Sequence, residues 1–415
     1  MAMAPLATTA QSNAVPSPIG GLNTRDSVDL LPETDAIRLD NFFPARSHVQ
    51  VRNGYDDHVT GLPSSVESLM VYNSGTASTM FAASGTAVYN VTSAGSVGSA
   101  VITSLTNARF QSVNMTTSGG SFLFICNGAD APRHWNGSAW ATPTLGSVTA
   151  ANIINVEVYK ERLFFVLKDS LTYGYLPVNA VAGTVASVNL GSVFSKGGKI
   201  MAIATWTRDG GAGPDDNILF FTDQGEIAMY SGTDPSDATK WGLVGVYTVG
   251  RPIGHRCMLK VGSDCYLVTE NGLLPMTQVL GTGEAAPNVA LSDKISSSYN
   301  SSVVEFKGTF GWQGVVYPKG GYAAVNAPAS TVGDFIQYII NLETGAWSRF
   351  TNQDAYVWAV FNSDLYFGGS TKVYKADSGT DDSGSAIEAV AKTAFIYFGG
   401  RNGPKRYTAI RPVMA

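Results

Sequence analysis

The chain has 415 residues, only 14% of them charged, and its formal net charge is −5. This weak net charge excludes a protein that binds nucleic acid over its whole surface. No run of 18 apolar residues occurs, so no transmembrane helix is expected, and residues 1–17 lack the basic region of a secretory signal peptide. The low charge and the 45 glycines indicate many short strands joined by tight turns.

The N-terminal part of the chain contains two segments of different composition. Residues 1–17 consist largely of Ala, Thr, Ser and Pro without periodicity, which predicts a flexible arm. Residues 18–63 include two adjacent phenylalanines, Phe42 and Phe43. Such a pair forms an apolar patch that soluble surfaces avoid. We therefore expect residues 18–63 to be an extended lead-in that packs along the fold or against a neighbouring subunit.

One sequence pattern recurs along residues 64–385. A short apolar run is followed by a Gly or Asp turn and then by a second run that often ends in Tyr. Its seven copies are Met80–Ala83 with Val88–Tyr89, Phe122–Ile125 with Trp135, Leu163–Val166 with Tyr173, Ile218–Phe221 with Ile227–Tyr230, Cys265–Val268, Gly314–Tyr317, and Leu365–Gly368 with Val373–Tyr374. A spacing of roughly 40 to 55 residues is typical of an array of similar supersecondary units.

Units of short strands with glycine-rich turns predict an all-β fold, a β-propeller of six or seven blades over residues 64–385. Helix-compatible stretches are short, at 291–300 and 388–393, and neither sustains a period of 3.6 residues. A propeller closes when its last blade bonds to its first, usually because strands from both chain ends share one blade. The closing strand is not evident from the sequence.

Residues 386–415 form a last segment with a distinct charge. Two strands are expected here, Ala389–Phe398 and Tyr407–Val413, which either complete a blade or form a docking ribbon. From Ile387 onward one residue is acidic and five are basic, namely Lys392, Arg401, Lys405, Arg406 and Arg411. Since the total is −5, the rest of the chain carries about −9. A basic edge of this kind is either solvated or docks on an acidic partner.

Residues that carry metal or enzymatic chemistry do not form recognisable sets. The four histidines are isolated, and the odd, low cysteine count is typical of a protein folded in a reducing cytoplasm. Cys126 and Cys265 are predicted core residues, and a Cys257–Cys265 disulfide is the less favoured alternative. The acidic stretch Asp377–Asp382 is interpreted as a polar turn in preference to a calcium loop. We predict no catalytic residue, metal or cofactor.

Two carbohydrate hypotheses stay open. Propeller glycosidases place an acid and a nucleophile at the centre of one face, but nothing in the sequence pairs the carboxylates that could lie near blade tops. These are Glu161, Asp223, Glu226 and Glu270. Trp135 and Trp140 could stack on sugars, although tryptophans at strand ends more often fill the wedge between blades.

Four groups of motifs, taken in order, resemble one family. They are Pro18–Asp26 with Asp35–Ala36 and Asn41–Pro44; Gly250–Gly254 with Tyr266–Leu273; Asn341–Arg349; and Trp358–Phe361 with Leu365–Gly369. Together they resemble the nozzle (hub) proteins in the tails of short-tailed bacteriophages, the tail tubular protein B-like family, over about residues 18–411. Their order and spacing are more specific than any single motif.

The resemblance implies a structural virion protein of the tail, assembled in the host bacterial cytoplasm and without catalytic residues. It would form a homo-hexameric ring below the adaptor (head-to-tail connector) ring and portal complex and carry tail fibres or a distal plug (needle). Genomic DNA would be retained above it and pass through its channel without sequence-specific binding. The residues expected at interfaces are Ile19, Leu22, Phe42, Phe43, Lys405, Arg406 and Arg411.

The chain departs from this family in one respect, since further strands are expected beyond Arg411. The alternatives are a propeller carbohydrate-binding or depolymerising tail protein that contacts host surface glycan, and a secreted propeller lectin. In the nozzle hypothesis the channel wall is expected to be neutral or negative, because a basic wall would trap DNA through counterion release. The cluster Lys405, Arg406 and Arg411 is then expected to face the adaptor or an adjacent subunit.

Overall fold

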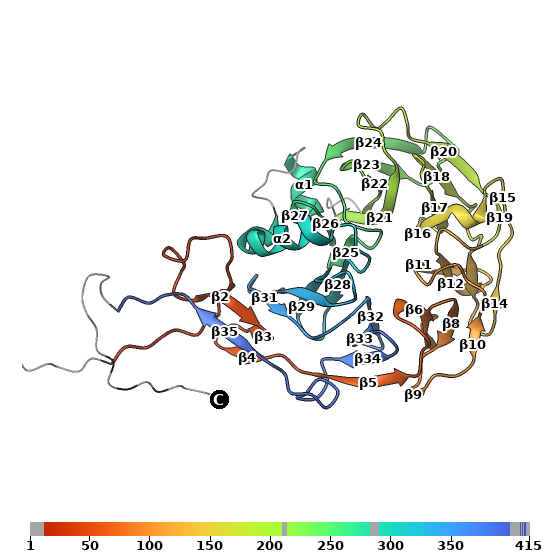
Figure 1. The fold of residues 1–415 in the computed structure, drawn as a ribbon. Helices are drawn as coiled ribbons and strands as arrows, with labels where there is room; N and C mark the ends of the chain where they lie inside the picture. Colours follow the sequence, from red (N-terminus) through yellow and green to blue (C-terminus); the bar gives the residue numbers. More distant parts are fainter. Residues whose placement is uncertain are drawn as a thin grey trace, which may run out of the picture.

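The computed structural model describes residues 12–209, 214–282 and 290–398, together with residues 407, 409 and 411. In this part of the chain, seven sheets of three or more strands follow one another around a ring (Figure 1). Each sheet contacts the next, and the last contacts the first. The protein is therefore a closed β-propeller, which confirms the predicted fold class.

The first four blades are antiparallel meanders of four strands each. The first two consist of β6 (Val66–Asn73), β7 (Ser78–Ser84), β8 (Ala87–Asn90) and β10 (Ala100–Ile102), then β11 (Gln111–Thr117), β12 (Gly120–Cys126), β13 (Arg133–Trp135) and β14 (Trp140–Ala141). The next two consist of β16 (Ile153–Tyr159), β17 (Arg162–Leu167), β18 (Thr172–Tyr175) and β20 (Ala186–Asn189), then β21 (Ile200–Asp209), β22 (Pro214–Thr222), β23 (Glu226–Gly232) and β24 (Trp241–Thr248).

The fifth blade has three described strands and continues into helices where the other blades have a fourth strand. Its elements are β25 (Met258–Val261), β26 (Asp264–Thr269), β27 (Gly272–Pro275), α1 (Met276–Thr282), the 3-10 helix η3 (Leu291–Ile295) and α2 (Ser296–Phe306). Five of the eleven residues of α2 are Ser, a weaker helix former than Ala or Leu, so the sequence shows little helical signal. The helix is stabilised by burial of Tyr299 and Val303, which lie one turn apart on the face toward the core.

The sixth and seventh blades complete the ring. They consist of β28 (Gln313–Tyr317), β29 (Tyr322–Pro328), β30 (Phe335–Asn341) and β31 (Trp347–Phe350), then β32 (Val357–Phe361), β33 (Asp364–Gly368), β34 (Val373–Ala376) and β5 (Tyr55–Thr60). The closing strand is thus β5, which pairs antiparallel with β34 through Val59↔Val373 and Asp57↔Tyr374. It lies inside the segment 18–63 that was expected to be a lead-in.

Short elements connect or extend the blades. They are β1 (Gly21–Leu22), β2 (Asp35–Asp40), β3 (Phe42–Pro44), β4 (Val49–Val51), β9 (Gly95–Ser96), β15 (Leu145–Gly146), the 3-10 helix η1 (Ala150–Asn152), β19 (Gly183–Thr184) and β35 (Val390–Thr393). Of the two C-terminal strands that were expected, β35 lies within the first, Ala389–Phe398. The second, Tyr407–Val413, lies largely outside the described residues.

The recurring pattern corresponds in six blades to the second strand, which is enclosed by its own sheet and by both neighbouring blades. The apolar clusters lie mainly between successive blades, for example Phe164 and Phe220 between the third and the fourth. The sixth copy differs, because Gly314–Tyr317 lies in the first strand of its blade, β28. The second strand there, β29, is fully buried but is built from small residues around Asn326, so it lacks the bulky apolar run.

Candidate functional site

The two ends of the chain extend the sixth blade into a sheet of seven strands. Strand β1 pairs in parallel with β31 and β2, and β35 pairs antiparallel with β2. We name β1, β2 and β35 the terminal platform; it projects outward from the ring at the left of Figure 1. Gly21 is needed where β1 meets β31, because its φ is +82° and an added Cβ would lie 2.4 Å from the carbonyl oxygen of Trp347.

Two buried carboxylates fix the platform to the propeller. Asp35 accepts hydrogen bonds from Lys294 Nζ at 2.8 Å and from Asn23 Nδ2 at 2.9 Å. Asp40 accepts two from Arg349, Nε at 2.7 Å and Nη2 at 2.9 Å. Burial by itself raises the pKa of Asp40, but hydrogen bonds from Arg349 and Arg38 outweigh burial and hold the pKa below its ordinary value. Asp40 is therefore a charged anchor at neutral pH.

A third buried ion pair joins the lead-in to the segment that follows the last blade strand. Arg52 Nη1 and Nη2 donate to the two carboxylate oxygens of Asp382 at 2.8 and 2.6 Å. Arg52 Nε also donates to Asn41 Oδ1 at 2.9 Å, and Nη2 donates to the carbonyl of Thr351 at 3.1 Å. Arg52 is 4% exposed and Asp382 is 6% exposed. The pair is thus desolvated and well hydrogen-bonded. In such a pair, removal of one partner leaves an uncompensated buried charge and strongly lowers the free energy of unfolding.

The acidic stretch Asp377–Asp382 forms a turn against the lead-in. Gly54 packs so closely on this turn that an added Cβ would lie 1.7 Å from the carbonyl oxygen of Asp381. Asn53 Nδ2 donates to Asp377 Oδ1 at 2.8 Å, and the Gly384 amide donates to Asp381 Oδ1 at 2.5 Å. The carboxylates of this stretch therefore bond to nearby amides and to Arg52. Among the described residues, no three His, Cys, Asp or Glu side chains gather in a way that could hold a metal ion.

The predicted interface residues of the lead-in have different environments. Phe42 and Phe43 lie in β3, are half-buried, and pack against the chain's own propeller, where the Phe43 ring lies 5.9 Å from that of Tyr322. Ile19 is also half-buried. Leu22 is 3% exposed and belongs to the core, so its contacts are within the chain. Much of the apolar area of these lead-in side chains is therefore buried against the propeller of the same chain.

The basic residues predicted at interfaces lie downstream of the platform. Arg411 is exposed, whereas Lys405 and Arg406 lie outside the described residues. Large apolar side chains of the same region face solvent: Leu30 in the β1–β2 connection is 76% exposed, and Phe395 after β35 is 52% exposed. Tyr397 Oη donates to Asp29 Oδ1 at 3.3 Å, so the segments around Leu30 and Phe395 lie next to each other. Only contiguous apolar patches of several hundred Å² mark surfaces that contact other proteins, and single exposed apolar side chains are ordinary.

Asp35 lies within a motif of the family resemblance, but no role was predicted from the sequence for Asp35, Asp40 or Arg52. Each finds its main partner in a distant part of the chain. The pairing of β2 with β35 places the N-terminal motifs beside the C-terminal strand. The sequence does not reveal this pairing. One sequence signal was present in Asp35-Ala-Ile-Arg-Leu-Asp40. Its charged residues do not alternate strictly with the apolar ones, which indicates a strand that is buried on more than one side.

A cationic cluster crosses the centre of the ring. Arg256, at the start of the fifth blade, donates through Nη2 to the carbonyl of Glu67, to Ser68 Oγ and to the carbonyl of Phe110, at 2.8 to 3.0 Å. The guanidinium groups of Arg256 and Arg109 lie over the Phe310 ring, 5.3 and 4.4 Å from its centroid, as cation–π contacts. Burial lowers the pKa of Arg256 to about 10. The fifth blade is therefore tied directly to the first and second across the ring.

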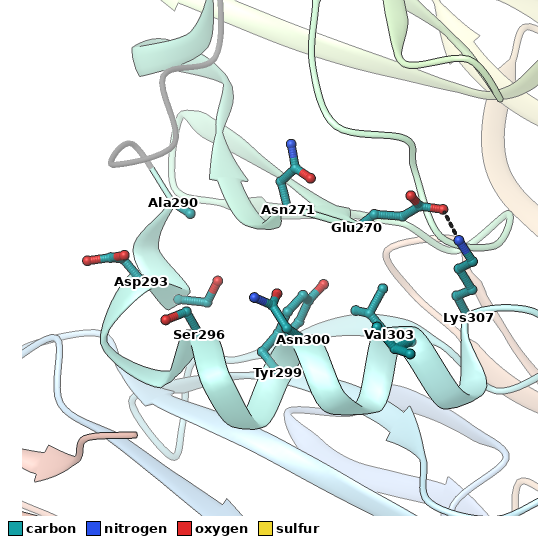
Figure 2. A pocket seen from close by; sticks show the side chains of 11 residues that line it. Glu270, Asn271, Ala290, Asp293, Ser296, Tyr299, Asn300, Val303 and Lys307 are labelled. Carbon is teal, nitrogen blue, oxygen red and sulfur yellow. Dashed lines mark hydrogen bonds and ion pairs between the residues drawn. The ribbon is translucent and has the colours of Figure 1, made fainter. Parts of the chain in front are cut away.

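A pocket of about 530 Å³ lies between the β26–β27 turn and α2 (Figure 2). Asn271 and Asn300 come from opposite sides, and Glu270 pairs with Lys307 Nζ at 3.0 Å at one end. The Tyr299 hydroxyl donates to the carbonyl of Thr269 at 2.7 Å. The pocket thus presents amides, hydroxyls and a neutralised ion pair, which suit a polar ligand or a partner loop.

The four carboxylates considered for glycoside hydrolysis each have separate local partners. Glu226 is buried and accepts from the Ser195 hydroxyl at 2.6 Å, while Asp223 accepts from the Lys199 amide at 2.9 Å. Glu161 accepts from Asn179 Nδ2 at 3.3 Å, and Glu270 is paired in the pocket. Burial raises the pKa of Glu226, but hydrogen bonds from Ser195 and Lys196 outweigh it and lower the pKa overall. These groups cap turns between strands.

The aromatic and thiol candidates pack inside the fold. The Trp135 and Trp140 rings lie 5.6 Å apart, and each contacts Phe81. All three cysteines are buried and reduced. Burial raises the pKa of Cys257 to about 12 and also raises those of the other two.

In the described ranges, no helix is both long and apolar enough to cross a membrane.

No family model and no curated protein matches the chain. Among the solved structures that match, the crystal structure of BBS1N in complex with ARL6DN shares 11% sequence identity with the chain. The match covers 78% of this chain and 96% of that chain, with a TM-score of 0.48. At this identity the likeness concerns the fold alone.

Proposed function

We propose that the protein is the structural subunit of a nozzle ring in the tail of a short-tailed bacteriophage. The observation that carries the proposal is the terminal platform, in which segments from both chain ends are built into one blade. Motifs of the family resemblance lie in this sheet, in β1, β2 and β31. A sheet that extends beyond the propeller and is anchored by buried ion pairs is a rigid mount for contacts between subunits and with an adaptor.

In the proposed ring, six copies surround the tail axis, dock below the adaptor and carry fibres or a distal plug. The subunit contributes shape and charge instead of chemistry. Outside residues 387–415 each copy carries about −9, since the five basic residues of that segment are excluded. A channel formed by the acidic body repels the DNA backbone or leaves it unbound, which favours passage of the genome over its capture.

The mass of the purified protein, measured alone and with the adaptor ring by native mass spectrometry, tests the proposal. A hexamer, or a monomer that hexamerises only on the adaptor, supports it. A dimer or trimer that ignores the adaptor would exclude the nozzle assignment. Turnover of capsule or cell-wall glycan by the purified chain, abolished by one carboxylate substitution, would instead establish a depolymerase.

A further inference from the structure

Strand β24 is the outer edge of the fourth blade and differs from the other edges of the ring. It has eight residues, whereas β10, β14 and β20, the outer strands of the first three blades, have three, two and four. Eight strand residues give an edge roughly 26 Å long. Among the described residues only β23 pairs with β24. Its other edge therefore offers a row of main-chain donors and acceptors.

The side chains of β24 do not protect this edge. Natural edge strands are usually kept from pairing by charged residues, by proline or by their short length. The strand Trp241-Gly-Leu-Val-Gly-Val-Tyr-Thr248 has no charged residue and no proline. Leu243, Val244 and Val246 are 46%, 49% and 38% exposed. A bulge near Val244 is the one protective feature, and it leaves the strand on both sides of it paired to β23.

The outer edges of the closing blades are treated differently. The closing strand β5 carries Asp56 and Asp57 and is covered in part by β9. The edge of β31 is covered by the terminal platform. An exposed, apolar edge is thus a particular property of the fourth blade.

Charge complementarity favours one occupant. Residues 200–250, which form the fourth blade, hold seven acidic and two basic residues, a net charge of −5. Residues 399–415 hold four basic residues and no acidic one, a net charge of +4. Their sequence Tyr407-Thr-Ala-Ile-Arg411 contains Tyr, Thr and Ile, which are frequent in β-strands. Tyr407 and Arg411 are exposed, so they remain available for contact.

We propose that β24 of one copy binds residues 399–415 of a second copy as an added antiparallel strand. Main-chain hydrogen bonds would supply the pairing, the exposed Leu243 and Val246 would cover the apolar side chains of the added strand, and the acidic blade would attract its basic residues. The contact is head-to-tail, because the donor segment follows β35 in the chain whereas the acceptor edge belongs to the fourth blade. Repetition of a head-to-tail contact generates a ring when its rotation closes. The inference rests on the proposed ring and names the contact that links its subunits.

Cysteine pairing between two differently labelled full-length copies tests this contact. One copy carries Val246→Cys, and a second, labelled with 15N, carries Ala409→Cys; diamide oxidises the mixture. The native cysteines are at most 1% exposed and do not compete. The control replaces Val246→Cys by Val101→Cys on β10, which is 41% exposed. We expect mixed-label disulfides at least tenfold above this control. Equal yields would overturn the proposal, and so would a disulfide confined to single copies when both substitutions are placed in one chain.

A charge on the edge gives a second, independent readout. Leu243→Lys places a cation where the basic strand docks, and self-association measured by sedimentation should weaken at least tenfold. Val101→Lys, the matched change on β10, should leave association within about twofold. Hexamers that form without the β24 disulfide would overturn the strand contact and leave the nozzle proposal standing. If copies are cross-linked through β24 but form no ring on the adaptor, the nozzle proposal is refuted and the strand contact is retained.

Discussion

Removal of one partner from the Arg52–Asp382 ion pair should destabilise the protein strongly. Arg52→Met keeps most of the apolar stem but removes the guanidinium, which leaves the Asp382 carboxylate buried without its counter-charge. It also removes the donors to Asn41 and to the carbonyl of Thr351. Loss of one member of a buried pair typically costs about 3–5 kcal/mol.

The size of this loss translates into a measurable shift of the melting temperature. Unfolding entropy is about 2.1 cal/mol/K per residue, so a chain of 415 residues has roughly 0.9 kcal/mol/K. A loss of about 3–5 kcal/mol then lowers Tm by about 3–6 °C. The shift is measured by differential scanning calorimetry at one protein concentration, because assembly would also raise Tm.

A matched control separates burial from charge. Arg46 and Glu343 form an exposed ion pair, with side chains 74% and 56% exposed, so Arg46→Met should lower Tm by no more than about 1 °C. The double variant Arg52→Met/Asp382→Leu should be more stable than Arg52→Met alone, since no unpaired charge remains buried. Equal Tm values for Arg52→Met and Arg46→Met would refute the reasoning.

Three further experiments test the lead-in. Phe42→Ser with Phe43→Ser should cost about 2–4 kcal/mol and impair ring assembly, because both rings pack on the propeller; unchanged Tm and assembly would show that the segment is a passive tether. Gly54→Ala should lower Tm by several degrees, because the added Cβ clashes with the acidic turn. Gly98→Ala is the control and should leave Tm unchanged, because its added Cβ meets nothing within 4 Å. Equal Tm values for the two variants would contradict the close packing of Gly54. Because the folded pKa of Asp40 is depressed, its ion pairs add stability above about pH 4 that is lost as pH falls through the folded pKa. Urea unfolding should therefore show that Asp40→Asn costs more at pH 7 than at pH 3; an equal cost would show that the charge does not matter.

The fold was predictable from the sequence because blade interiors impose a local signal. The second strand of a blade is buried on both faces, so it reads as a short apolar run, as in Phe220 and Phe221. The signal fails in the sixth blade, where β29 uses Ala and a hydrogen-bonded Asn326 in place of bulky groups. It also fails for α2, where burial of Tyr299 overrides weak helix propensity.

The candidate site was less predictable because its residues are joined across the whole chain. The sequence identified Phe42 and Phe43 from their adjacency, and the basic C-terminal segment from its charge. The partners of Asp40 and Arg52 depend on which strand follows β31 in the sheet, and no local pattern encodes this order. The exposed edge of β24 also appears only when the neighbours of each strand are known.

Closure of the ring by β5 has a consequence for synthesis of the chain on the ribosome. Strand β5 is made early, but its partner β34 follows about 310 residues later, which takes roughly 15 seconds to one minute at usual translation rates. During this interval the nascent strand has no hydrogen-bonding partner on that side. Charged residues on an unpaired strand, such as the adjacent Asp56 and Asp57 of β5, disfavour pairing with other chains. The same two carboxylates later meet Ser378 and Lys372, so the groups that delay association before closure stabilise the blade after it.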